Sequence, residues 1–456
     1  MLLVNTTKRI GFLAIALCLT LSLTAQINSP YSRYGLGDLI PAQPAASRGM
    51  GGISAPFVDI QALNTSNPAS YGSIGIVTYD LGVTIDTRTM RSVAPEGKYK
   101  STAFIPAYLQ IGVPINRTRH IGAVLGIRPV TNINYSLMTG GRNPNASNDS
   151  INVLYEGNGG LNEIFAGLGK KWGNFAVGFN AGYSFGKKDI STKVLPYNDS
   201  LTYYKGNSYS TTSFNSPFID LGVQYEFPLS KIDDKENKTT TTYSLRIGAN
   251  AKLQQKLNAT SNITNETFEY TNSGDTMRVD SVYKTATAKG KIDIPVSYRA
   301  GVMFLKTYSN SYGMTATHWG IGAEYENTQW SKYSYFGVKD PSLVNSWVVR
   351  LGGQITPEPD PIRAHSFWGR STYKAGFYAG QDYINADGNK TKVMAFTFGI
   401  GFDLRKPNYI QQYTKINTAF EFGKRGSNVN NVTENFFKFT VGLSLSDVWF
   451  IKRKYD

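Results

Sequence analysis

The sequence predicts an all-β fold, a transmembrane antiparallel β-barrel of about 14 strands. Three observations support this class. The composition of 29 Tyr, 24 Phe and 45 Gly in 456 residues, with only 17% charged residues, favours strands and turns over helices. After residue 25 there is no run of 18 apolar residues that would form a membrane-spanning helix. From residue 76 onward, segments of about ten residues alternate apolar with polar or small side chains, as membrane-barrel strands do.

Residues 1–25 are predicted to be a secretory signal peptide. Lys8 and Arg9 form its positive start, and the apolar stretch 10–23 is too short for a stop-transfer helix. Cleavage is expected after Ala25; the alternative is an N-terminal anchor. The only cysteine, Cys18, lies in this leader, so we expect no disulfide and no Cys-ligated metal in the mature chain. These features predict export to the cell outer membrane.

The formal net charge is +15. An exported chain rarely meets nucleic acid, so we expect no nucleic-acid partner. Attraction to anionic outer-membrane lipid and lipopolysaccharide explains the basicity more economically. The alternative is that the excess charge is scattered over solvated loops. The densest basic run is the C-terminal tail 451–456.

Residues 26–75 are predicted to be a compact irregular segment, because prolines and glycines interrupt any strand pattern there. The barrel is expected over 76–450. Its fourteen predicted strands are 76–86, 103–113, 120–137, 161–171, 175–187, 212–227, 241–257, 292–305, 317–327, 346–356, 372–381, 392–404, 415–424 and 437–446. An even number is expected of bacterial barrels, and twelve or sixteen strands are the alternatives.

The non-apolar face of these strands carries glycines and charges, which suits a polar lumen behind a lipid-facing wall better than a soluble sandwich. The charged examples are Asp80, Asp220, Arg246, Lys252 and Glu324.

The polar stretches 140–158, 188–209, 229–240 and 258–291 are predicted to be long loops. If the short turn 172–174 faces the periplasm, 229–240 is expected on the opposite side, where it competes with 188–209 for the same face.

Several motifs resemble the FadL/TodX family of outer-membrane transporters of hydrophobic compounds. The stretch GGISA at 51–55, followed by NPAS at 67–70, is similar to the family's N-terminal hatch. IPVSYRAG at 294–301, WSKY at 330–333 and VVRLG at 348–352 are similar to later family motifs and come in the family's order.

The resemblance implies that residues 26–75 form an N-terminal hatch, or plug, inside the lumen of a fourteen-stranded barrel. It also implies that a hydrophobic, long-chain fatty acid-like ligand leaves sideways through a kink in the third strand. Pro129 lies in the predicted third strand and cannot donate to a ladder, which suits such an opening; the alternative is a strand that simply ends at Arg128. The candidate site residues are, for the hatch and ligand, Tyr31, Arg33, Tyr34, Asn67, Pro68 and Ala69, and, for the lateral opening, Arg128, Pro129 and Val130.

Enzymatic motifs are missing from the sequence. The three histidines, His120, His318 and His365, are far apart, and there is no nucleophile elbow, zinc-protease motif or phosphate loop. We therefore expect no enzyme activity, no cofactor and no metal.

Two functions follow for such a barrel. The first is passive transport of hydrophobic small molecules. The second is a non-transport role as a subunit of an envelope protein complex, for type IX secretion or outer-membrane assembly. In the second case the segment 29–38 and the tail 451–456 are candidate docking sites. A soluble secreted β-protein is a third, weaker alternative.

Overall fold

The computed structural model describes residues 29–93, 96–143, 146–197, 204–236, 238–271, 276–284, 287–310, 315–360, 364–386, 388–404, 413–426 and 432–447. The predicted signal peptide and the basic tail lie outside these ranges. The long strands, in chain order, are β2 (Val77–Ser92), β3 (Gly97–Asn116), β4 (Ile121–Pro129), β5 (Thr131–Asn143), β6 (Ala146–Trp172), β7 (Phe175–Tyr197), β8 (Lys205–Asp234), β9 (Thr239–Lys252), β10 (Gln255–Tyr270), β11 (Thr276–Lys284), β12 (Ala288–Ile294), β13 (Ser297–Ser309), β14 (Thr315–Thr328), β17 (Ser346–Ile355), β18 (Thr372–Ala386), β19 (Asn389–Asp403), β20 (Thr414–Gly426) and β21 (Val432–Asp447).

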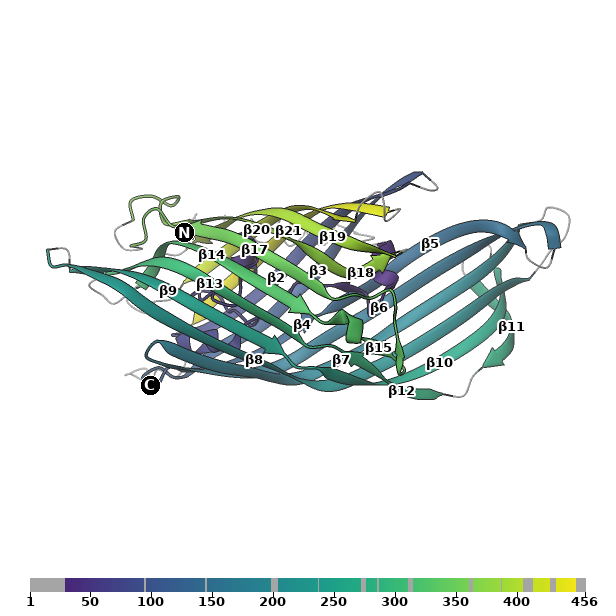
Figure 1. The fold of residues 1–456 in the computed structure, drawn as a ribbon, viewed down its shortest axis with the longest axis horizontal. Helices are drawn as coiled ribbons and strands as arrows, with labels where there is room; N and C mark the ends of the chain where they lie inside the picture. The colour runs from purple at the N-terminus through teal and green to yellow at the C-terminus, as the bar shows by residue number, and fades with distance from the viewer. Residues whose placement is uncertain are drawn as a thin grey trace, which may run out of the picture.

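These strands close into an antiparallel barrel of 14 wall strands, as the sequence predicts (Figure 1). The last strand, β21, pairs with the first, β2, from Val77↔Asp447 to Ser92↔Val432. Three predicted strands are each built from two pieces: β4 with β5, β9 with β10, and β12 with β13. Closure leaves no free edge between first and last strand, which a membrane requires of a sheet.

The alternation along β8 shows how the wall is built. Ile219, Leu221 and Val223 are 44–45% exposed and face outward, whereas Asp220 and Gln224 are buried and face the lumen. An outward apolar face on a barrel is covered by lipid rather than by protein. The wall is therefore transmembrane, and its polar face surrounds the N-terminal segment.

Most of the residues predicted to form long loops are strand. Strands β5, β6, β7, β8 and β10 continue far beyond their neighbours at one end of the barrel, the tall end, where β11 also lies (Figure 1). The loop prediction over 140–158, 188–209 and 258–291 was wrong because these extensions are rich in Asn, Ser, Thr, Lys and Asp and have no continuous apolar face. Strands that rise from the membrane into water lack the apolar–polar alternation by which half-buried strands are recognised.

The strand path also corrects the predicted sidedness. The turn 173–174 joins β6 to β7, and the chain then climbs to the tall end and returns along β8. The β8–β9 turn, within 229–240, therefore lies at the same end as 173–174, which we call the short-turn end. The conflict with 188–209 disappears, because that segment belongs to the tall end.

The N-terminal segment 29–76 lies inside the barrel and contains only short elements (Figure 1). Among the described residues, no helix has the length and apolar character needed to cross a bilayer. The short elements here and in the β14–β17 connection are η1 (Pro30–Arg33), β1 (Asp38–Leu39), α2 (Ala45–Arg48), η2 (Pro68–Ser73), η3 (Trp330–Lys332), β15 (Ser334–Tyr335) and β16 (Val338–Lys339).

Candidate functional site

Asn67, in the predicted hatch motif, caps the short helix η2, and this cap packs against the barrel wall. The Asn67 side chain accepts a hydrogen bond from the Ala69 amide at 3.1 Å, and Pro68 occupies the first helical position of η2, where a missing N–H costs nothing. The Asn67 amide also donates to the Ala55 carbonyl at 2.6 Å. Asn67 and Ala69 are fully buried. These residues therefore hold the plug together; they do not face an open ligand path.

Glycines on the lumen face of the wall let the plug backbone approach closely. A Cβ at Gly248 in β9 would lie 2.0 Å from the Ala55 carbonyl oxygen, and a Cβ at Gly222 in β8 would lie 2.0 Å from Asn67 Oδ1. Any side chain at these positions collides with the plug.

Replacement of Gly248 with valine is therefore expected to push the plug off the wall. We expect a loss of roughly 1–3 kcal/mol of stability, the usual cost of overpacking. The measurement is the thermal unfolding midpoint in detergent. The matched control is Gly206→Val in β8, where an added Cβ meets nothing within 4 Å. Equal midpoints for the two variants would contradict the close contact.

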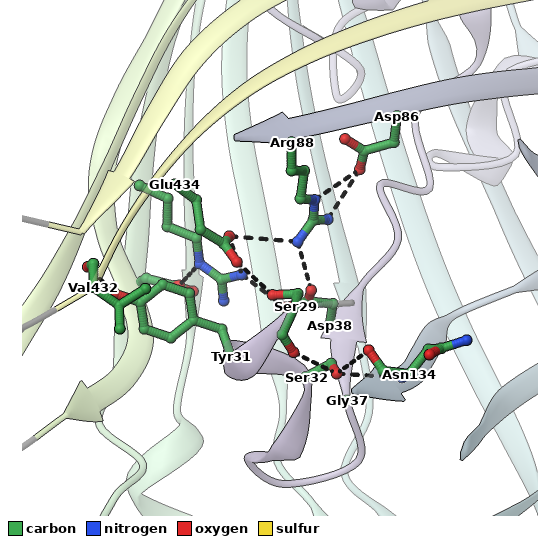
Figure 2. A network of polar contacts seen from close by, with 12 residues as sticks. Ser29, Tyr31, Ser32, Gly37, Asp38, Asp86, Arg88, Asn134, Val432 and Glu434 are labelled. Atoms are coloured by element: carbon green, nitrogen blue, oxygen red, sulfur yellow. Dashed lines mark hydrogen bonds and ion pairs between the residues drawn. The ribbon is translucent and has the colours of Figure 1, made fainter. Parts of the chain in front are cut away.

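A network of buried charges ties the start of the plug to the wall near the tall end (Figure 2). Arg88 of β2 donates to Asp38 of the plug at 2.6 Å and to Asp86 at 2.9 Å. On the other side, Arg425 of β20 contacts Asp38 at 2.7 Å, and Glu434 of β21 lies 3.4 Å from Arg88. Asp38 is thus held between two arginines from strands on either side of the barrel seam.

The first residues of the plug join the same network. Ser29 donates to Glu434 at 2.5 Å, and Tyr31 donates its hydroxyl to the Val432 carbonyl at 2.7 Å (Figure 2). The Arg425 guanidinium lies 4.8 Å from the centre of the Tyr31 ring. Burial raises the pKa of Tyr31, so its hydroxyl stays protonated and keeps this donor role.

Electrostatics favours the ionised form of Asp38. Burial alone raises the pKa of this carboxyl, but the charges of Arg425 and Arg88 outweigh burial and hold the pKa below its ordinary value of 3.8. A carboxyl with a lowered pKa stabilises the folded state above its unfolded pKa and loses that contribution as the pH falls toward the folded one.

We therefore expect the stability difference between wild type and Asp38→Asn to be constant from neutral pH down to about pH 5 and to shrink only below 3.8. The comparison of the two proteins isolates Asp38 from other carboxyls. Thermal unfolding midpoints measured across this pH range check it, and a difference that vanishes between pH 7 and pH 5 would contradict the assignment.

Further contacts hold the middle of the plug. Glu324 of β14 accepts hydrogen bonds from the backbone amides of Ser54 and Ala55 at 2.7 and 2.6 Å. Arg48 of α2 lies 3.7 Å from Glu421 of β20. The plug is thus fixed by charged wall residues along much of its length.

The predicted hatch residues do not form one site. Tyr31 belongs to the network near the tall end, whereas Asn67, Pro68 and Ala69 lie against β7 and β8. Arg33 is exposed and stacks on Tyr34, with 5.5 Å from its guanidinium carbon to the ring centre.

Asp38, Arg88, Arg425 and Glu434 are functional candidates that the sequence pattern alone did not indicate. The available signal was charge on the lumen-facing positions of otherwise alternating strands. Because Ser29, Tyr31, Ser32 and Asp38 are buried, the segment 29–38 is mostly covered and is a poor docking surface.

The wall is interrupted where the sequence places Pro129. β3 pairs with β4 from Asn116↔Ile121 only as far as Leu109↔Ile127. Beyond that point no ladder joins β3 to β5 in the described part of the chain, and β5 instead pairs with the plug strand β1 through Asp38↔Asn132 and Leu39↔Thr131. A gap between β3 and β5 therefore opens beside the plug.

Local backbone chemistry produces this gap. Pro129 has no N–H to donate, and the Val130 amide donates to the Leu161 carbonyl at 2.7 Å. Gly160 in β6 has φ +148°, and a Cβ there would lie 2.3 Å from the Thr131 carbonyl oxygen. A residue with a side chain could not adopt this backbone easily, so the glycine permits the bend that turns β5 away from β3.

A cavity of about 950 Å³ occupies the gap. Its lining is mainly apolar, with a few amides, and includes Phe104, Leu109, Tyr183, Phe185, Phe214 and Asn162. Pro129 lines it directly. Arg128, also part of the lining, is buried and binds Glu163 at 3.0 Å and Asp220 at 3.1 Å. Arg128 is thus an ion-pair anchor at the inner side of the gap.

Within the described ranges, no group of three His, Cys, Asp or Glu side chains could hold a metal ion. His120 lies in the β3–β4 turn with a φ of 49°, and His318 lies in β14.

Solved structures with the same architecture come from bacterial outer-membrane proteins. A Pseudomonas aeruginosa FadL homologue matches over 90% of this chain and 99% of its own, with 14% identity and a TM-score of 0.56. The Ralstonia pickettii toluene transporter TbuX matches over 89% and 99%, with 14% identity and a TM-score of 0.52. The Pseudomonas putida toluene transporter TodX matches over 90% and 99%, with 14% identity and a TM-score of 0.51.

At this identity the likeness concerns the fold, and it confirms the FadL-like barrel that the sequence motifs predict. No curated protein sequence matches the chain. One family model does match, and it covers residues 7–456, which include both the plug and the whole barrel. The chain therefore belongs to the BamG family.

Proposed function

We propose that this protein acts in the outer membrane as a passive conduit for hydrophobic small molecules, of the size and character of long-chain fatty acids. The observation that carries the proposal is the gap between β3 and β5 with its largely apolar cavity. A ligand in this cavity has the bilayer on one side and the plug on the other. It can therefore move between lumen and membrane without crossing water.

The chemistry of the gap suits such a ligand. Ligand pockets are typically apolar with a few polar groups that fix orientation, and a volume of about 950 Å³ lies within the usual range. Phe104 and Leu109 on β3 and Phe185 on β7 supply the apolar surface, and Asn134 and Asn162 supply the polar groups. The fold that this chain shares with the toluene transporters supports the proposal of a hydrophobic ligand.

Uptake of radiolabelled palmitate by whole cells tests the proposal. Cells that lack the chromosomal copy are complemented with the wild-type protein or with a variant from which residues 29–40 are deleted. We expect palmitate uptake to require the wild-type protein and to differ in the deletion variant. Equal uptake with and without the protein would refute transport of this class of ligand.

A second function is favoured by a different observation. The plug is fixed by buried ion pairs at Asp38 and by Glu324, and a gate that opens frequently is usually held by weaker contacts. A barrel with a fixed plug suits a non-transport subunit of an envelope complex for type IX secretion or outer-membrane assembly. Affinity purification from detergent-solubilised native membranes tests this role. Recovery of stoichiometric protein partners supports it, and recovery of this chain alone counts against it.

A further inference from the structure

Three lysines form a compact basic patch on the outer surface, where the barrel leaves the apolar belt at the tall end. Lys256 lies on β10, and Lys289 and Lys291 lie on the neighbouring strand β12. All three are exposed. Because Asn258 pairs with Lys291, Lys256 is diagonal to Lys291 and two residues from Asn258. Lys256 and Lys291 are thus about 7–8 Å apart. Lys289 lies two residues from Lys291 on the same face of β12, about 7 Å further along the strand. The long lysine side chains can therefore converge on one ligand near Lys291.

Amide side chains complete the patch. Asn258 is exposed and pairs across the sheet with Asn215 of β8 on one side and with Lys291 on the other. Amide N–H groups donate hydrogen bonds to phosphate oxygens, and lysine binds phosphate as a point charge. The patch therefore has the donors that an anionic phosphate needs.

The acidic side chain beside the patch already has a hydrogen-bond partner. Asp293 pairs across the sheet with Lys256, but its Oδ2 accepts a hydrogen bond from Ser334 of β15 at 2.7 Å, on the opposite side of β12. In the described part of the chain, no ion pair joins any of the three lysines to a carboxylate. Their charge is left for a partner.

The apolar belt begins immediately below the patch. Leu253, Ile219 and Tyr298 are 41–45% exposed, and the Leu253 amide donates to the Ile219 carbonyl at 3.2 Å. An aromatic residue beside lysines at the edge of an apolar wall is typical of the level of lipid head groups. The occupant is thus part of the bilayer: its acyl chains lie on the belt and its head group lies at the lysines.

We propose that Lys256, Lys289, Lys291 and Asn258 form a binding site for the phosphate group of an anionic lipid in the bilayer leaflet at the tall end. None of these four residues lines the cavity in the gap between β3 and β5, although Asn215, the cross-strand neighbour of Asn258, does. The site does not depend on which function the barrel serves. Such a lipid fixes the height of the barrel in the membrane on the side of β8, β10 and β12.

Native mass spectrometry of the full-length protein in mild detergent tests the site, with phosphatidylglycerol as the probe and zwitterionic phosphatidylcholine as the comparison lipid. We expect the triple variant Lys256→Gln/Lys289→Gln/Lys291→Gln to bind phosphatidylglycerol at least about tenfold more weakly than wild type, because each lysine near a membrane surface contributes to attraction of anionic lipid. Phosphatidylcholine binding should not change.

The matched control removes three exposed lysines at the short-turn end, Lys231→Gln/Lys235→Gln/Lys238→Gln, and so lowers the net charge equally. This control should keep the wild-type affinity. Equal affinity of the patch variant and wild type would overturn the proposal. So would equal binding of the two lipids by wild type, or an equal loss in the control variant, which would indicate a diffuse charge effect. A difference in gel mobility between heated and unheated samples verifies that each variant is folded.

Discussion

Replacement of Asp38 with alanine is expected to release the start of the plug from the lumen while the barrel remains folded. Asp38 is the partner that Arg88 and Arg425 share, at 2.6 and 2.7 Å. Without Asp38 the two arginines keep their wall carboxylates, Asp86, Asp382 and Glu434, but the plug loses both of its ion pairs to the wall. Breaking a buried ion pair costs up to about 3–5 kcal/mol. The barrel ladders do not depend on this side chain, so the loss falls on local docking of the plug.

Hydrogen–deuterium exchange over residues 29–40 measures this effect, because exchange follows the free energy of local opening. The control is Asp233→Ala, which removes an exposed pair with Lys231 near the short-turn end. Faster exchange in the plug of Asp38→Ala alone is expected. Exchange that is unchanged from wild type would show that the network does not hold the plug.

Replacement of Asn162 with tryptophan is expected to block the gap. Asn162 on β6 lines the cavity and pairs with Pro129 on β4 and with Phe185 on β7. Its side chain is only partly buried, so a larger residue can be accommodated without disturbing a packed core. An indole here occupies the space that a ligand must enter, and we expect palmitate uptake to fall about tenfold or more.

The control for this variant is Asn174→Trp, in the exposed turn between β6 and β7 at the short-turn end. It adds the same side chain away from the gap and should leave uptake at the wild-type level. Both proteins must show equal amounts of folded barrel in the membrane. Normal uptake in Asn162→Trp would mean that hydrophobic molecules do not pass through the gap.

The wall strands could be predicted from sequence because their side chains alternate regularly between the lipid and the lumen. In β8, the outward Ile219, Leu221 and Val223 alternate with lumen-facing residues, and lipid on one side with a polar lumen on the other imposes that pattern. The extensions at the tall end were missed because Asn, Ser, Thr, Lys and Asp dominate them and they have no continuous apolar face. There the strands are held together by backbone hydrogen bonds, which require no particular pattern of side chains.

The site was predictable only in part. Pro129 marked the break in the wall because a residue without an N–H disturbs any ladder. The network at Asp38 was not found, because Asp38 and Arg425 are 387 residues apart in the chain and only barrel closure brings them together. Gly248 and Gly222 looked like ordinary lumen-facing positions, and their role as contact points is set by where the plug backbone runs.

The proposed function requires a hydrophobic ligand in the gap between β3 and β5. Native mass spectrometry, with lipid analysis, of the protein purified in mild detergent from its own membranes tests this requirement most directly. We expect a bound hydrophobic small molecule in wild type and in Asn174→Trp, and its loss in Asn162→Trp. An empty barrel that carries stoichiometric protein partners, or a ligand retained by Asn162→Trp, would contradict it.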